Sequence, residues 1–197
     1  QQEIDAAHAR RFAILAEGIN VLGTPARNPS EEIIKRYFLN AFHANDLLAG
    51  YLRYEREWRA LRLPRGSIIA DVRFTELMQR MIEDGLHMYW YVRLYAHPRF
   101  ALMMKNSFML RLTQIIYAHK GPLGNILERF LWKPLAPGII DFRDSRAVDY
   151  IEEVFSLSDA PGVYIKFGEA HVKGIVQRLL ARGWEVSDYH TFSPLIH

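Results

Sequence analysis

Cysteine is absent from this chain of 197 residues. Its absence excludes disulfide frameworks, cysteine nucleophiles, and zinc or iron–sulfur sites held by thiolates. The chain also lacks a G-x-S-x-G elbow, a P-loop, an H-E-x-x-H helix and a G-x-G-x-x-G loop. Serine hydrolases built on a nucleophile elbow, nucleoside triphosphatases, zincins and dinucleotide-dependent enzymes therefore lack their expected motifs.

Long apolar runs are missing as well. Basic residues interrupt the aromatic-rich stretch 86–117, which never approaches the roughly 20 apolar residues that a membrane-spanning helix requires. We therefore expect no transmembrane segment. Because aromatic and basic residues interleave there, two interpretations stay open: a buried helix pair, which such a pattern more often indicates, and peripheral contact with a membrane.

The charge of the chain is close to balanced. Half of the residues are hydrophobic and the net charge is +3, which indicates a folded globular protein of mild basicity. Five arginines recur at every third position: Arg53, Arg56, Arg59, Arg62 and Arg65. On an α-helix a three-residue step drifts around the axis, so they form no single stripe. This pattern favours a solvated helix with one partner-facing edge over specific nucleic-acid binding.

The first two thirds of the chain are predicted to be helical. Apolar spacing and the Gly and Pro breaks predict five helices, at residues 2–21, 30–61, 74–95 and 98–119, and a short one ending before Pro134. The short apolar run at 67–71 fits either a strand or an extended lead into the next helix. Asp144 is expected to cap a further helix that ends near Phe155.

The last third alternates strand and helix signals. Residues 163–167 and 184–189 are predicted strands, and the helix predicted at 172–182 would connect them in a right-handed parallel crossover. We therefore expect an α-rich α/β fold: a bundle of about five helices followed by a small C-terminal βαβ unit. The helical region would be 1–133 and the α/β unit 134–197, packed together as one domain.

The turn Gly168-Glu169-Ala170-His171 is the best candidate site. It follows a predicted strand and opens a helix, and ligands of parallel sheets gather where the strands end. A neutral imidazole beside a carboxylate can bind a metal or move a proton. A lone histidine at such a turn is more often a capping or packing residue, so both interpretations stay open.

Residues 162–186 resemble the closing segment of the TraB and Tiki superfamily, which includes erythromycin esterase and ChaN-like proteins. The shared pattern is G-x-x-H at Gly168 to His171, a glycine at 174, then a leucine-rich helix end, a glycine, an aromatic and a valine. The resemblance implies a metal-assisted hydrolase that uses a divalent metal. His171 would be a catalytic base or a metal ligand, and Glu169 would support it in catalysis and in metal binding.

The resemblance stops short of the whole family pattern. Family members open with a strand that carries a further G-x-x-H or G-E-x-H motif, and no such motif occurs upstream of residue 162. Three explanations stay open: the front half lies before Gln1, the chain is a non-catalytic relative, or the likeness is accidental.

Two further interpretations compete with the hydrolase. The pairs Asp5 and His8, Asp84 and His87, and His43 and Asp46 each stand three residues apart, the spacing of helical di-metal sites. About one such match is expected by chance, and the glutamates that such sites need on facing helices are not evident.

The second alternative is a non-catalytic helical interaction or scaffold module, a subunit of a larger assembly. Its aromatic and arginine-rich helix faces would bind a protein partner, a second copy of the chain or a membrane surface.

Overall fold

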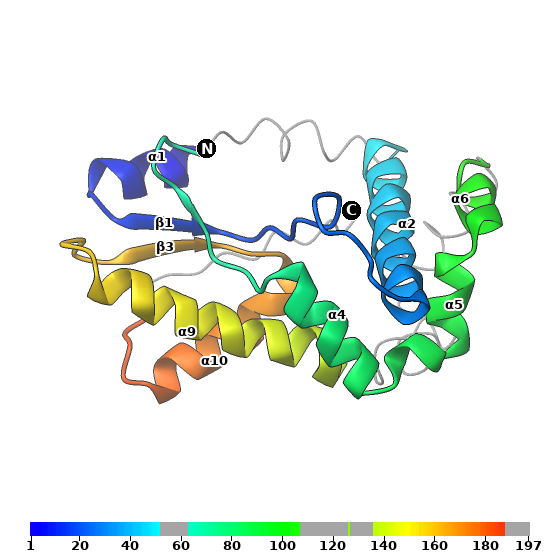
Figure 1. Cartoon of the computed structure of the whole chain (residues 1–197). Helices are drawn as coiled ribbons and strands as arrows, with labels where there is room; N and C mark the ends of the chain where they lie inside the picture. The colour runs from blue at the N-terminus through cyan, green and yellow to red at the C-terminus, as the bar shows by residue number, and fades with distance from the viewer. Residues whose placement is uncertain (52–62, 107–125, 127–135, 188–197) are drawn as a thin grey trace. The chain divides into compact units, whose positions relative to one another are not determined.

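A computed structural model of the chain describes residues 1–51, 63–106, 126 and 136–187, except for the side chains of residues 45–51, 136 and 169 (Figure 1). Within these ranges it contains seven α-helices, two short helices of other types and one parallel sheet of three strands. The α-rich α/β class expected from the sequence is confirmed. In the same ranges, no helix combines the length and the apolar character needed to cross a membrane.

The sheet unites the start, the middle and the end of the chain. Its strands are β1 (Ala13–Ala16), β2 (Ile68–Ile69) and β3 (Val163–Lys166), in the spatial order β2-β1-β3. Leu15 of β1 stands opposite Ile68 on one side and Ile165 on the other. A central parallel strand is covered on both faces, which explains why β1 is a continuous apolar run rather than an alternating one.

The helix predicted at 2–21 is wrong beyond its first two turns. Helix α1 (Gln2–Ala9) ends early, and Arg11 adopts a left-handed backbone with φ of 58°. The chain then turns into β1, whose backbone groups bond to β2 and β3. The run Ala-Ile-Leu-Ala is short enough to fit a helix or a strand, and pairing with distant segments decides in favour of the strand.

Two helices cover one side of β1 and β3, and α1 lies on the other side (Figure 1). These are α9 (Phe142–Ser156), which follows the π-helical segment η2 (Ala136–Asp141), and α10 (Glu169–Ala181). Their apolar faces meet the sheet in one core cluster, which contains Leu15, Ala70, Ala147, Val148, Ile151, Phe167, Ile175 and Leu179.

The strand predicted at 184–189 is not formed over residues 184–187, and residues 188 and 189 lie outside the described ranges. Trp184 instead packs its ring against Phe155 of α9, with 4.8 Å between ring centroids, and its indole N–H donates to Glu152. Among the described residues, the parallel neighbour of β3 is β1, from the opposite end of the chain.

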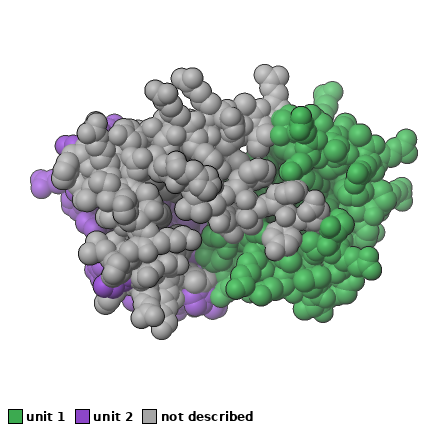
Figure 2. All heavy atoms as spheres, turned by 180° about the vertical axis from the view of Figure 1, so that it is seen from behind, with its two compact units in different colours: residues 1–19, 61–73, 140–193 green, residues 20–60, 74–139, 194–197 purple. Residues whose placement is uncertain are grey.

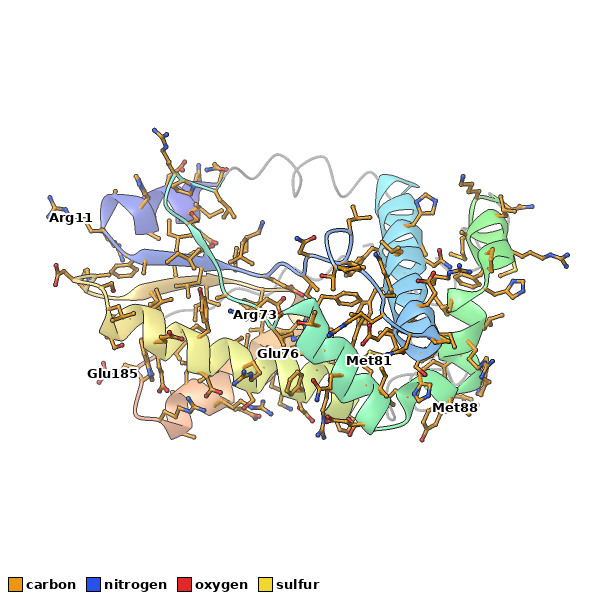
Figure 3. All side chains as sticks on the ribbon, viewed as in Figure 1. Arg11, Arg73, Glu76, Met81, Met88 and Glu185 are labelled. Carbon is orange, nitrogen blue, oxygen red and sulfur yellow. The ribbon has the colours of Figure 1, made fainter. Side chains whose placement is uncertain are left out.

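The remaining helices form a separate group. They are α2 (Pro29–Tyr51), α4 (Phe74–Glu83), the 3-10 turn η1 (Leu86–Met88), α5 (Trp90–Ala96) and α6 (Pro98–Met104). The helix predicted at 74–95 is interrupted at Gly85, where a φ of 68° favours glycine. Met81 of α4 is fully buried (Figure 3). The helix predicted at 98–119 is wrong as one continuous element, because α6 ends at Met104 and residues 105 and 106 are not helical. The helix end predicted at 61, residues 107–119 and the short helix before Pro134 lie outside the described residues.

Contacts divide the chain into two compact units (Figure 2). Unit 1 contains residues 1–19, 61–73 and 140–193, and unit 2 contains residues 20–60, 74–139 and 194–197. This grouping differs from the expected boundary at 133/134, because the pairing of β1 and β2 with β3 brings N-terminal segments into the C-terminal unit.

Leu15→Ala tests the central position of β1. Leu15 is completely buried, so its truncation leaves a cavity and should lower the free energy of unfolding by about 2 to 5 kcal/mol. The matched control is Leu22→Ala, at a side chain that is 81% exposed, and it should change stability by less than about 0.5 kcal/mol. Chemical denaturation of both variants provides the measurement, and equal stabilities would contradict the assignment of Leu15 to the core.

Candidate functional site

Charged side chains gather where the three strands end. Glu17 follows β1 directly, Asp71 lies two residues after β2, and Gly168 lies two residues after β3. Because parallel strands end at the same edge of a sheet, all three reach one place, and all belong to unit 1. Three segments far apart in the sequence thus contribute to one site.

Arg143, the second residue of α9, lies at the centre of the site. Its Nη2 donates to Glu17 Oε1 at 2.5 Å and to Asp71 Oδ2 at 2.6 Å, and its Nε donates to Asp71 Oδ1 at 3.2 Å. The Arg143 side chain is 8% exposed. Burial alone would lower the pKa of Arg143, but the hydrogen bonds and charges of Asp71 and Glu17 outweigh burial and raise that pKa. The guanidinium is therefore a permanent positive charge that solvent hardly reaches.

His171, in the first turn of α10, is paired with the next residue of α9. Its Nδ1 lies 2.6 Å from Asp144 Oδ1, and both side chains are buried, at 3% and 1% exposure. We assign the Nδ1 proton to this hydrogen bond, since a carboxylate can only accept. The other ring nitrogen, Nε2, lies 2.9 Å from Arg143 Nη1 and 3.5 Å from Glu17 Oε1.

Asp144 fits this place because α10 carries a glycine opposite it. A Cβ at Gly174 would lie 1.8 Å from Asp144 Oδ2, so only glycine allows α9 and α10 to approach so closely. Arg178 Nη1 lies 3.7 Å from the same oxygen. The expected capping role of Asp144 is wrong: it lies inside the first turn of α9, and its carboxylate bonds to His171.

Glu17 is the member of the site that solvent reaches. Its side chain is 30% exposed, and its Oε2 accepts from the backbone N–H of Gly168 at 2.6 Å. Burial would raise the pKa of Glu17, but the charge of Arg143, the charge that His171 carries when its ring is protonated, and the Gly168 hydrogen bond together lower it below its ordinary value. Glu17 is therefore ionised at neutral pH.

The residues present do not fit a metal ion. Among the described residues no set of three or more His, Asp or Glu side chains is arranged to hold one. Arg143 occupies the space between the carboxylates of Glu17 and Asp71, and it contacts Nε2 of His171. The metal-ligand role expected for His171 thus has no support among the described side chains, and the role expected for Glu169 stays a prediction. Glu169 begins α10, and its side chain lies outside the description.

The helical acid-x-x-His pairs make no site in the described residues. Asp5 accepts from the side chain of Gln1, and Asp84 forms an ion pair with Arg80 at 3.0 Å. His43 and His87 each have one buried ring nitrogen without a hydrogen-bond partner. No metal-binding group forms around them in the same part of the chain.

Sequence reasoning placed His171 correctly at a strand-to-helix turn but missed four of its neighbours. Glu17, Asp71, Arg143 and Asp144 come from three other segments. One signal was available: an acidic residue stands at the end of each of two short apolar runs, Ala13–Glu17 and Ile68–Asp71.

Comparison with family models, with curated proteins and with solved structures found no match for this chain.

The lowered pKa of Glu17 predicts a pH dependence of stability. A depressed pKa contributes stability that is fully present above the unfolded pKa, about 4.3 for glutamate, and is lost as the pH falls through the lower folded pKa. Glu17→Gln should remove this contribution, so the stability difference from the unchanged protein should shrink as the medium becomes more acidic. Urea denaturation of both proteins at a series of pH values, from neutral to below about 4.3, measures this stability difference. The exposed Glu185→Gln is the control (Figure 3), and a difference independent of pH would contradict the prediction.

Gly174→Ala tests the close approach of α9 and α10. Alanine is the better helix former by about 1 kcal/mol, so a net loss of stability isolates the clash with the buried Asp144. We expect a net loss of about 1 to 3 kcal/mol. Lys173→Ala, at the exposed neighbouring position, should stay within about 0.5 kcal/mol. A stabilised Gly174→Ala protein in thermal unfolding would refute the contact.

Proposed function

We propose that this chain is a hydrolase of neutral acyl compounds, esters or amides, in which His171 is the general base. The observation that carries the proposal is the hydrogen bond between His171 Nδ1 and the buried Asp144, which leaves Nε2 directed at the Arg143 guanidinium. An oriented imidazole next to a fixed cation is the minimal equipment for base-catalysed attack of water on a carbonyl group.

Asp144 would act by positioning the imidazole. A buried carboxylate that accepts from Nδ1–H holds one tautomer and one ring orientation, and it stabilises the imidazolium that forms when Nε2 takes a proton. This arrangement requires Nε2 to be the atom that receives the proton of the attacking water. When the tetrahedral intermediate collapses, the acyl C–O or C–N bond breaks and the Nε2 proton passes to the leaving alcohol or amine, which returns His171 to its neutral form. Asp144 itself keeps its charge throughout.

Arg143 would supply the positive charge for the oxyanion. Of its five N–H groups, four have acceptors among the described residues: Nε and both on Nη2 reach carboxylates, and one on Nη1 reaches His171 Nε2. The second N–H of Nη1 is the donor that remains for a substrate oxygen. The bond from Nη1–H to His171 Nε2 must open before this nitrogen can accept a proton from water, while the bonds to Glu17 and Asp71 hold the guanidinium in place.

Glu17 is the other candidate base, because it is close to Nε2 and partly exposed. Its lowered pKa makes it a weaker proton acceptor than an ordinary carboxylate. We therefore assign Glu17 the role of holding Arg143 at the entrance of the site, and His171 the proton transfer.

The charge of the site selects the class of substrate. With His171 neutral, Glu17, Asp71 and Asp144 carry three negative charges against the two positive charges of Arg143 and Arg178, and Arg178 lies 3.7 Å from Asp144. Such a surplus disfavours phosphate esters and other anions, since like charges repel strongly where burial reduces screening. Neutral or cationic esters and amides suit it better.

The proposal keeps the hydrolase expectation raised by the likeness of residues 162–186 to the TraB and Tiki superfamily, and it assigns the chemistry to side chains rather than to a metal. A front-half histidine is not needed for it, because Glu17 after β1 is the N-terminal contribution to the site.

One observation also favours the non-catalytic alternative. Arg143 with its two carboxylates is a buried ion cluster, and such clusters occur as structural devices that fix the packing of strand ends. An interaction or scaffold module that uses this cluster only for its fold would show no hydrolysis, while substitutions at Arg143 would still unfold it.

His171→Asn separates these functions. Asparagine retains a polar side chain but cannot serve as a base near neutral pH, so hydrolysis of neutral p-nitrophenyl esters and peptide p-nitroanilides should fall about a hundredfold or more. His8→Asn, at an exposed histidine of α1, is the matched control and should keep full activity. Activity should also survive chelator treatment.

Three results would decide against the proposed mechanism. Loss of activity with a chelator, restored by a divalent cation, would return the site to metal-assisted chemistry. Equal activity of His171→Asn and the unchanged protein would remove His171 from catalysis. Absence of hydrolysis in a folded protein across both substrate classes would leave the scaffold function in its place.

A further inference from the structure

Helices α5 and α6 expose large apolar side chains together with basic ones. Trp90, Leu102 and Met88 are 60%, 67% and 63% exposed, and Leu94 and Met103 are exposed beside them. Met88 is labelled in Figure 3. Arg93, Arg99 and Lys105 are exposed on the same two helices and their ends. We call these eight residues the α5–α6 face.

The residues of the α5–α6 face recur at the spacing of one side of an α-helix, and the other side of each helix is buried. Trp90, Arg93 and Leu94 stand at positions i, i+3 and i+4 of α5, and Arg99, Leu102 and Met103 repeat this pattern in α6. The opposite sides of the helices are buried through Tyr91, Val92, Ala96, Phe100 and Met104. Both helices therefore carry apolar side chains on their buried and on their exposed sides, and cations stand among the exposed ones.

Charge is distributed unevenly along the sequence in the same region. Residues 85–140 contain seven of the 25 Lys and Arg residues but one of the 22 acidic residues, Glu128. This segment carries a net charge of +6, and the remaining residues together carry −3. Within the described part of the chain, Arg93, Arg99 and Lys105 form no ion pair. Their charges are thus available to an anionic partner.

We infer that the α5–α6 face binds the surface of a membrane that contains anionic lipids. A tryptophan and several aliphatic side chains between cations match the boundary between acyl chains and head groups, where the apolar groups insert and the cations meet phosphates. Each helix has seven residues, so the contact lies along the surface and does not cross the bilayer. The inference is independent of hydrolysis, because the face belongs to unit 2 and the site to unit 1.

The test uses the full chain and vesicles of phosphatidylcholine with and without phosphatidylserine, separated by sedimentation. Binding should require phosphatidylserine and should weaken as salt is added, since salt screens the attraction of exposed cations. Leu102→Ser should lower the partition coefficient about five- to tenfold, because an inserted leucine is lost. Leu157→Ser, at a leucine directly after α9 that is 82% exposed, should leave binding unchanged.

A charge reversal adds a second arm. Arg99→Glu should lower binding at least about fivefold. Position 99 is in the first turn of α6, where glutamate suits the positive end of the helix, so folding should be preserved. Arg10→Glu, at an exposed residue after α1, is its control.

Circular dichroism and thermal unfolding check that each variant is folded. Three outcomes would overturn the inference. They are no binding to either kind of vesicle, binding without preference for phosphatidylserine, or binding by both Leu102→Ser and Arg99→Glu that is as strong as that of the unchanged protein. Loss of self-association in these variants, measured by analytical ultracentrifugation without any effect on vesicles, would assign the face to a second copy of the chain instead.

Discussion

The buried guanidinium of Arg143 is the interaction on which the geometry of unit 1 depends. A cation with 8% exposure is tolerated only when carboxylates match it, and these come from the ends of β1 and β2. The start of α9 and the ends of both strands must therefore meet at one point. Asp144, the next residue of α9, points about 100° further around the helix and reaches His171 instead. Two consecutive residues thus connect the sheet on one side and α10 on the other.

The fold could be predicted from the sequence where the signal is local. Val163–Lys166, followed by a glycine turn and a helix with one apolar face, is recognisable from its own residues, and so are α2 and α9. The run at residues 13–16 is not, because four apolar residues carry no period that separates a strand from a helix. Its conformation depends on hydrogen bonds to Ile68 and to residues 163–166, which no local pattern contains. A helix predicted over residues 13–16 leaves β3 without β1 as its parallel partner, so the sequence indicates a later segment, 184–189, in its place.

The site follows the same division between local and non-local information. His171 could be found because Gly168 and the start of α10 stand beside it in sequence. Glu17 and Asp71 could have been found only after the strands were paired in parallel, since nothing except the sheet brings two residues 54 positions apart to one edge. Asp144 was interpreted as a cap because a carboxylate in a first helical turn usually acts locally. Gly174 indicates that Asp144 does not act locally, because the glycine leaves room for the Asp144 carboxylate between the two helices. This role of Gly174 becomes visible only when α9 and α10 are packed together.

The small net charge of the chain is the sum of two unequal parts, and this explains why composition alone excluded so little. Residues 85–140 are strongly basic and nearly free of acid, whereas the remainder, which includes the carboxylates around Arg143, is acidic. Electrostatic effects between exposed charges fall off within about a Debye length, 8 to 10 Å at physiological ionic strength, so a partner responds to the charges near its binding site rather than to the total. The site proposed to disfavour anions and the basic surface proposed to bind them are therefore both compatible with a net charge of +3. The net charge of a protein limits its partners only where its charges are mixed evenly.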